Sequence, residues 1–295
     1  MVLRTRPCIL CIPRAQVLYV PMAKTAEANK HVRDFSTNIS LYEKGSPEYT
    51  KESVEFLLCR VGVLPSVRKE PTKLLEIATG TGKFTRVMVQ VLTASEANVE
   101  IIASDPLLAM CEAFRCLVPE IEMRQFPAES IALPDESVPV IMCAQAFHWF
   151  CSETTVTDIC RVLKPGGKFG MIWNHRDHSV PWVRALQDIV DPFVKQKDMP
   201  PGPRELKWME TLNKSGKFTP VERNTEFRTY VEGDMEKIVA AIMCVSAITQ
   251  SSIEERRSVE AKVRDIITNH PDLQGTKVYK LPYITDICWC ANKLL

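Results

Sequence analysis

Hydrophobic residues in the central part of the chain fall into short apolar runs separated by amphipathic stretches. Short apolar runs bounded by turn or helix signals are typical of buried strands. Four such runs are predicted as strands, at 74–77, 99–104, 140–144 and 169–173. Helices are predicted between them, including 106–117 and 153–163. This alternation predicts an α/β fold with a parallel sheet.

The carboxyl-terminal part carries a different pattern. Residues 218–230 and 277–289 are predicted as two further strands, with helices at 235–249 and 252–269 between them. The second of these helices opens with a serine followed three residues later by a glutamate, which is a capping-box pattern. Its apolar residues repeat on one face, so it is expected to cover a core or to roof a cavity.

A further helix is predicted near the amino-terminal end, at 47–61. Ser46 is expected to cap it, and Pro47 suits the first helical position. Four apolar side chains fall on one face of this helix: Val54, Leu57, Leu58 and Val61.

The first predicted strand runs directly into a glycine turn and a helix start, which is how nucleotide-type cofactors are held. Gly80 and Gly82 stand one residue apart. A dinucleotide-binding turn would place glycine or alanine where this chain has Thr85, which weakens an NAD assignment. A phosphate-binding P-loop would require glycine at Ile77 and serine or threonine at Phe84, so ATP hydrolysis is not indicated.

The remaining pattern, Glu76 on the strand followed by Gly80 and Gly82, resembles the first motif of class I S-adenosylmethionine-dependent methyltransferases. In that family the turn passes beneath the methionine part of the cofactor. The family usually has glycine at the position of Ala78. If that position has positive φ, alanine costs roughly 1–2 kcal/mol, and we expect cofactor binding to be weakened but retained.

Two further segments fit the same family. Asp105 lies about twenty residues beyond the glycines, where a ribose-binding carboxylate is expected, although it could also cap the helix 106–117. Residues 126–135 resemble the segment that contacts adenine. Pro127 stands where the family often has an aspartate, so adenine is assigned to the backbone of Ala128.

The segments 145–150 and 161–168 resemble the type 11 branch of these methyltransferases, through A-F-H-W-F and R-V-L-K-P-G-G. Together the motifs cover 41–174. The resemblance implies a Rossmann-like doubly wound sheet of seven strands, mostly parallel with an antiparallel last strand, plus inserted helices. It assigns S-adenosylmethionine to the following residues: Tyr42, Glu76, Ala78, Gly80, Gly82, Asp105, Ala128 and Gln145.

Methyl transfer from a sulfonium depends mainly on positioning, so an essential base is needed only for an acceptor such as a hydroxyl. His148 is the first candidate base, followed by His175 and Asp177. The alternative for His148 is a place in an aromatic lid with Phe147 and Trp149, which could also contact the substrate.

The acceptor is predicted to be an oxygen of a small molecule, carboxylate or hydroxyl. Methyltransferases acting on amide or exocyclic amino nitrogens resemble one another in an N/D-P-P-Y segment, which is replaced here at 145–148. Arg176 could pair with an anionic substrate, or belong to a charged surface loop. Two alternatives stay open: a non-catalytic scaffold, suggested by Ala78 and Pro127, and an NAD-binding oxidoreductase, disfavoured by Thr85.

Composition restricts the choice further. The chain has 295 residues, 45% of them hydrophobic, and a net charge of +1 without a basic stripe, which argues against nucleic-acid partners. One domain is predicted at 29–295, with the cofactor core at 41–174 and helical cover plus the last two strands at 175–295. Residues 1–28 are predicted as an extension.

The eleven cysteines are scattered and suit small buried side chains in a reducing compartment. The pairs Cys8/Cys11 and Cys288/Cys290 lack histidines at zinc-site spacing, so no metal is predicted. The first 26 residues contain arginines and no acid, and their apolar run is too short to span a membrane. The cytoplasm is predicted, with a mitochondrial transit segment as the alternative.

Overall fold

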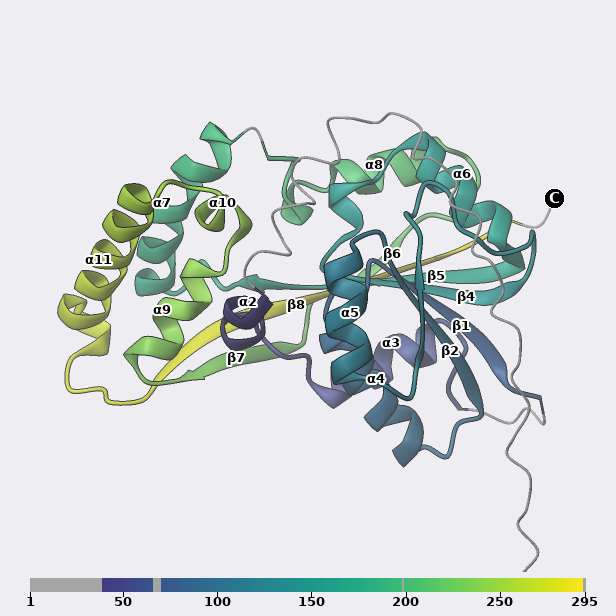
Figure 1. The fold of residues 1–295 in the computed structure, drawn as a ribbon, viewed down its shortest axis with the longest axis horizontal. Helices are drawn as coiled ribbons and strands as arrows, with labels where there is room; N and C mark the ends of the chain where they lie inside the picture. The colour runs from purple at the N-terminus through teal and green to yellow at the C-terminus, as the bar shows by residue number, and fades with distance from the viewer. Residues whose placement is uncertain (1–38, 66–69, 198, 294–295) are drawn as a thin grey trace, which may run out of the picture.

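The computed structural model of the protein describes residues 39–65, 70–197 and 199–293. The predicted extension at 1–28 and the Cys8/Cys11 pair lie outside the described residues. A mixed eight-stranded sheet crosses the molecule in the order β3-β2-β1-β4-β5-β8-β6, with β7 also pairing to β8 (Figure 1). The strands are β1 (Thr72–Ile77), β2 (Val99–Asp105), β3 (Glu122–Gln125), β4 (Val138–Ala144), β5 (Leu163–Arg176), β6 (Glu222–Asn224), β7 (Arg228–Gly233) and β8 (Tyr279–Ala291).

The strand directions confirm the predicted fold class. Strands β1 to β5 pair in parallel, and β8 runs antiparallel to β5, β6 and β7. The predicted strand 218–230 is corrected to two strands, β6 and β7. Three residues, 225–227, lie opposite only Thr285 and Asp286 of β8, so the edge bulges between β6 and β7.

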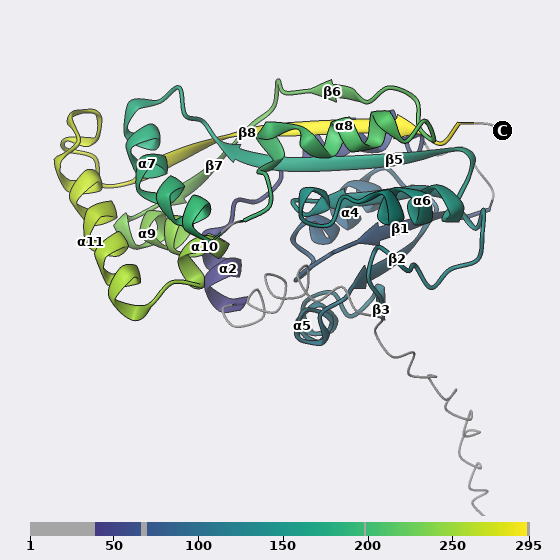
Figure 2. The ribbon, with the colours of Figure 1, turned by 90° about the horizontal axis from the view of Figure 1, so that it is seen from above.

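Helices cover both faces of the parallel strands. On one face α3 and α4 pack on the sheet with Leu57, Leu58 and Met88 fully buried, and on the other α6 and α8 bury Ile159 and Leu212. Figure 2 shows α8 and α6 lying along the sheet. The helices of the core are α3 (Lys51–Arg60), α4 (Lys83–Ala94), α5 (Leu108–Leu117), α6 (Glu153–Val162) and α8 (Lys207–Lys214), with short turns η2 (Phe147–Trp149) and η3 (Pro203–Glu205).

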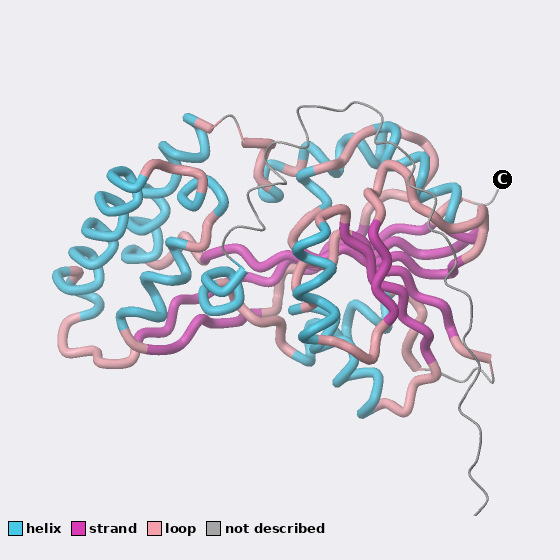
Figure 3. Tube along the Cα trace, in the orientation of Figure 1, coloured by secondary structure: helices cyan, strands magenta, loops and turns pink. Residues whose placement is uncertain are grey.

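Strands β5, β7 and β8 extend well beyond the parallel strands (Figure 3). We call this extension, made of the end of β5 at 174–176, β7 and the start of β8 at 279–284, the arm. Five helices gather on it and share a core in which Ile242, Val263 and Leu281 are fully buried. These helices, which we call the cap, are α2 (Ile39–Gly45), α7 (Pro181–Gln196), α9 (Met235–Met243), α10 (Ser246–Thr249) and α11 (Ile253–Asn269).

Several predicted boundaries were wrong. The helix predicted from Pro47 begins at Lys51, because Thr50 has extended backbone and its side chain accepts a hydrogen bond from the Ser53 amide. Ser46 instead donates its hydroxyl to the Tyr42 carbonyl at 2.7 Å. The predicted helix 235–249 is interrupted because Val245 is extended between α9 and α10. The fifth strand is longer than predicted and starts at Leu163.

Candidate functional site

The turn between β1 and α4 has the conformation that its glycines predicted. Gly80 and Gly82 have φ of 60° and 84°, and Ala78 also has positive φ, at 53°. A Cβ on Gly82 would lie 2.8 Å from side-chain atoms of Phe114 and Val118, so this position requires glycine. A Cβ on Gly80 would meet no described atom within 4 Å, which means that the turn is open at its apex to a ligand.

Glu76 is a fully buried carboxyl at the end of β1. Its Oε2 accepts a hydrogen bond from the Thr85 hydroxyl at 2.7 Å, and its Oε1 has no partner among the described residues. Burial raises the pKa of Glu76 to about 8. The hydrogen bond from Thr85 lowers this pKa and the nearby Asp105 carboxyl raises it, but both effects are smaller than that of burial. Thr85 is the residue that disfavours an NAD-binding turn. Its hydrogen bond to Glu76 connects the end of β1 to α4.

Asp105 lies at the end of β2, beside the glycine turn. Its carboxylate accepts hydrogen bonds from the amides of Gly80 at 3.0 Å and Leu107 at 2.9 Å. Burial raises its pKa to about 6, so it is largely ionised at neutral pH. Since a carboxylate accepts about four hydrogen bonds, two remain for a ribose diol. The predicted helix cap was wrong: α5 begins at Leu108.

The other predicted cofactor residues reach the same edge of the sheet. Ala128 is buried just beyond β3, and Gln145 follows β4 with φ of 59°. Gln145 Nε2 donates to the Asn174 carbonyl at 3.2 Å, which joins the ends of β4 and β5. Because the carboxyl ends of parallel strands meet at one edge, all four strand ends present their residues there.

A segment around α2 crosses over the glycine turn. Glu43 accepts hydrogen bonds from the Thr81 hydroxyl and from Arg86, the latter at 2.8 Å. Lys83, only 5% exposed, donates to Glu48 at 2.7 Å. These partners lie 35 to 43 residues apart, and no local sequence signal pairs them.

The same segment also contacts the arm. The Glu48 carbonyl accepts hydrogen bonds from Asn174 Nδ2 at 3.2 Å and from the Thr229 hydroxyl at 3.1 Å. Asn174 in turn accepts from the Thr285 hydroxyl at 2.7 Å. Tyr42, on α2, lies at this junction, and burial raises its pKa. The α2 segment therefore joins the cofactor edge to the arm.

His148 does not have the geometry of a general base. Its Nδ1 accepts a hydrogen bond from the Trp173 indole at 3.2 Å, and burial, with a smaller effect of His175, lowers its pKa to about 3. The neutral ring therefore carries its proton on Nε2, and its one lone pair is already used. This favours the lid interpretation.

The neighbours of His148 divide between core and surface. Phe147 is fully buried and packs edge-on against Phe169 and Trp208, with ring centroids 5.0 Å and 6.0 Å apart. It is thus placed in the core. Trp149 is partly exposed, with its ring 5.2 Å from that of His148.

Consecutive residues at the end of β5 point to opposite faces of the arm. Arg176 lies on the cap side, paired across the strands with Tyr283, and its Nη1 is buried without a partner among the described residues. His175 lies on the outer side, with Nε2 3.5 Å from Asp286. Asp177 accepts two hydrogen bonds from Ser179, chiefly from its hydroxyl, and these lower its pKa. The three predicted bases therefore each interact with a different residue: Trp173 for His148, Asp286 for His175 and Ser179 for Asp177.

The described residues also bear on metal binding and on membrane insertion. Within the described ranges, no group of three or more histidines, cysteines or acids is arranged to hold a metal ion. Cys288 and Cys290 are buried in β8, and burial raises the pKa of both thiols. No described helix is long and apolar enough to cross a membrane.

This geometry defines a class of protein. A parallel sheet with a glycine turn after its first strand, a carboxylate at the end of the second and an antiparallel closing strand is the arrangement of class I S-adenosylmethionine-dependent methyltransferases. The carboxylate of Asp105 and the open apex at Gly80 suit a cofactor that carries a ribose.

Comparison with known proteins agrees. A sequence profile of the methyltransferase domain matches residues 75–171. An uncharacterized methyltransferase of Schizosaccharomyces pombe is 31% identical, covering 83% of this chain and 91% of that protein. The malonyl-[acyl-carrier protein] O-methyltransferase of Methylococcus capsulatus is 31% identical over a shorter stretch, 33% of this chain and 36% of that one.

A solved structure shares the fold. Phosphoethanolamine N-methyltransferase 2 of Haemonchus contortus, in complex with phosphomonomethylethanolamine and S-adenosylhomocysteine, superposes with a TM-score of 0.52 at 15% identity, covering 88% of this chain and 58% of that chain. The chain described here belongs to the class I S-adenosylmethionine-dependent methyltransferases, in their type 11 branch. It is an enzyme, and its cofactor is S-adenosylmethionine.

Proposed function

We propose that this methyltransferase acts at an oxygen of a small molecule that bears a carboxylate. The observation that carries the proposal is Arg176, a guanidinium at the carboxyl edge of the sheet with a buried Nη1 that has no partner among the described residues. An unpaired buried donor costs free energy, and a bidentate carboxylate is the ligand that best satisfies a guanidinium.

The surroundings of Arg176 support a substrate chamber under the cap. Burial raises the pKa of Tyr283 and of Cys244, the latter to about 11, and Arg176 opposes both shifts. Lys83, at the start of the helix that follows the glycine turn, also acts on Cys244. Cys244 is thus close enough to interact with both Arg176 and Lys83, which supports a position of the guanidinium near the proposed cofactor.

The division of labour follows from these positions. S-adenosylmethionine supplies an activated methyl group when bound. Asp105 and the glycine turn are proposed to hold the ribose and methionine parts, and the backbone of Ala128 to hold the adenine. Arg176 orients the carboxylate, while the cap excludes water. A carboxylate needs no base, which agrees with the neutral, hydrogen-bonded ring of His148.

The similarity to malonyl-[acyl-carrier protein] O-methyltransferase supports an oxygen acceptor, although it covers only 33% of the chain. We also propose a cytoplasmic location, since every cysteine in the described part of the chain is free.

The test is a panel of small carboxylic acids, phenols and amines assayed for methyl transfer. We expect carboxylic acids to be methylated, and Arg176→Gln to raise KM for an accepted acid about tenfold or more, the value of one charge-assisted hydrogen bond. The matched control is Arg257→Gln, at an exposed position on α11. Preference for amines would contradict the proposal, and so would the absence of transfer to every carboxylic acid of the panel.

A further inference from the structure

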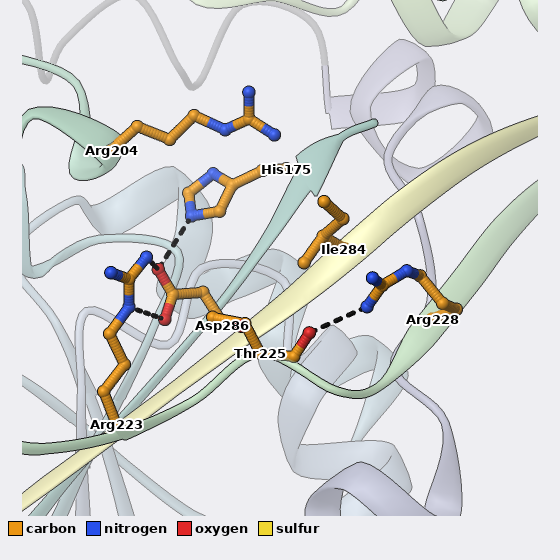
Figure 4. A pocket seen from close by; sticks show the side chains of 7 residues that line it. All are labelled: His175, Arg204, Arg223, Thr225, Arg228, Ile284 and Asp286. Carbon is orange, nitrogen blue, oxygen red and sulfur yellow. Dashed lines mark hydrogen bonds and ion pairs between the residues drawn. The ribbon is translucent and has the colours of Figure 1, made fainter. Parts of the chain in front are cut away.

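A basic pocket lies on the outer side of the arm, at the bulge between β6 and β7 (Figure 4). Its volume is about 350 Å³. It is open to solvent and is formed by residues from η3, β5, β6, β7, β8 and the bulge itself. These residues are His175, Arg204, Arg223, Thr225, Arg228, Ile284 and Asp286.

The charges in this pocket are unbalanced. Three arginines line it, and Asp286 is the one acid among the described residues that do so. Arg223 holds both oxygens of Asp286, through Nε at 2.7 Å and Nη2 at 2.8 Å, so that pair is neutral. Two positive charges, on Arg204 and Arg228, remain. Outside the lining, the Asp177 carboxylate offsets part of this charge, because it acts on both Arg204 and Arg228.

The two arginines keep unused donors. Arg228 uses Nη1 for the carbonyls of Thr225 at 2.7 Å and Phe227 at 3.0 Å. Arg204 uses Nη1 toward His178 and Nη2 for the Arg176 carbonyl at 2.6 Å. These contacts fix the positions of the two guanidinium groups. Since each guanidinium has five N–H donors, other donors of each group stay available to a ligand.

Two further groups in the pocket would interact favourably with an anion. Burial lowers the pKa of Arg204, and the neighbouring arginines Arg176 and Arg184 add to this effect. His175 Nε2 is buried and, among the described residues, makes no hydrogen bond, lying 3.5 Å from Asp286. An anion in the pocket would stabilise the first group and accept from the second.

We propose that this pocket binds a tetrahedral dianion, the phosphate group of a phosphate monoester. The lining holds three guanidinium groups against one carboxylate, which favours a phosphate monoester, with its charge of about −1.5 to −2 at neutral pH, over a monoanion. Planar guanidinium forks suit phosphate oxygens. The pocket is distinct from the cofactor site, because none of the residues assigned to the cofactor is among those that line the pocket. Phosphate and cofactor therefore bind together.

The test is a titration with inorganic phosphate, followed by ³¹P NMR at constant ionic strength, with and without S-adenosylhomocysteine. We expect saturable binding that S-adenosylhomocysteine does not displace, and about tenfold or more weaker binding of acetate. Arg228→Gln should weaken phosphate binding about tenfold or more. The control Arg257→Gln removes the same charge from α11 and should leave the affinity within about twofold.

A second variant guards against misfolding at the bulge. Ile284→Glu keeps every arginine and adds a carboxylate to the pocket, so it should abolish phosphate binding while circular dichroism stays unchanged. Absence of binding to the wild-type protein, equal weakening by Arg257→Gln, or displacement by S-adenosylhomocysteine would each overturn the proposal.

Discussion

The cofactor edge and the arm differ in how far apart their contacting residues lie in the sequence. At the cofactor edge, Gly80 and Asp105 are joined by a hydrogen bond across 25 residues, between two adjacent parallel strands. Next to the arm, where β6 pairs with β8, Arg223 and Asp286 are 63 residues apart, and in the arm Thr229 reaches Glu48 across 181 residues.

The cofactor edge contains the features that are general to the family, and the arm contains those that are particular to this chain. The cofactor edge consists of strand ends and turns whose conformation is set locally, by glycine, by positive φ and by the parallel register. The arm is assembled by side chains from distant segments. The account therefore predicts that variants at the cofactor edge change cofactor affinity, whereas variants in the arm change substrate or anion binding.

The largest effect is expected from Asp105→Ala. It removes two acceptors for the ribose, each worth about 1.5–3 kcal/mol, so the affinity for S-adenosylhomocysteine should fall by about a hundredfold or more in a calorimetric titration. Arg176→Gln, in the arm, should leave that affinity unchanged. Equal losses in both variants would erase the distinction between the two regions.

Glu76→Gln tests the buried carboxyl through pH. Because the folded pKa of about 8 exceeds the ordinary value of 4.5, the stability contributed by the protonated form is lost as pH rises between these values. The free energy of unfolding of the wild type should therefore fall by roughly 2–3 kcal/mol from pH 5.5 to 7.5 through this group. Urea denaturation of the glutamine variant should show a flatter profile, and an unchanged profile would refute the assignment.

His148→Phe tests the hydrogen bond that joins η2 to β5. It leaves the buried Trp173 indole without its acceptor, which should lower the free energy of unfolding by about 1–2 kcal/mol. His148→Asn retains an acceptor and is the control. In both variants the rate of methyl transfer should depend on pH as in the wild type, because the pKa of His148 lies near 3. If either variant changed this pH dependence, His148 would again be a candidate for the general base.

The smallest effect is expected at Ala78. Ala78→Gly relieves the left-handed strain at φ of 53° and should stabilise the free protein by about 1 kcal/mol, measured by urea denaturation. Cofactor affinity should rise slightly or stay constant. Destabilisation would mean that the loss of a methyl group outweighs the strain.

The cofactor edge was largely predictable from the sequence. Glycines at Gly80 and Gly82, a carboxylate at Asp105 and the apolar runs of the four strands carry local signals, and the structure shows the conformations that these signals predict. The family pattern raised a positive φ at Ala78 as a condition, and the structure meets that condition with φ of 53°.

The arm was less predictable, for physical reasons. Neither the bulge at 225–227 nor the pairing of Asp286 with Arg223 follows from local composition, because both depend on the register of β8 against two separate strands. The Glu43 and Glu48 contacts to the glycine turn are also tertiary. Side chains alternate between the two faces of β5, so His175 and Arg176 are predicted to lie on opposite faces. The roles of the two residues can be inferred only when the residues that pack on each face are known.

A calorimetric titration of the wild-type protein with S-adenosylmethionine and S-adenosylhomocysteine, with NAD as control, tests the central claim most directly. The account predicts micromolar binding of both sulfur cofactors, abolished or strongly weakened in Asp105→Ala, and no binding of NAD. Binding of NAD, or wild-type affinity in Asp105→Ala, would contradict the assignment of the carboxyl edge of the sheet as the cofactor site.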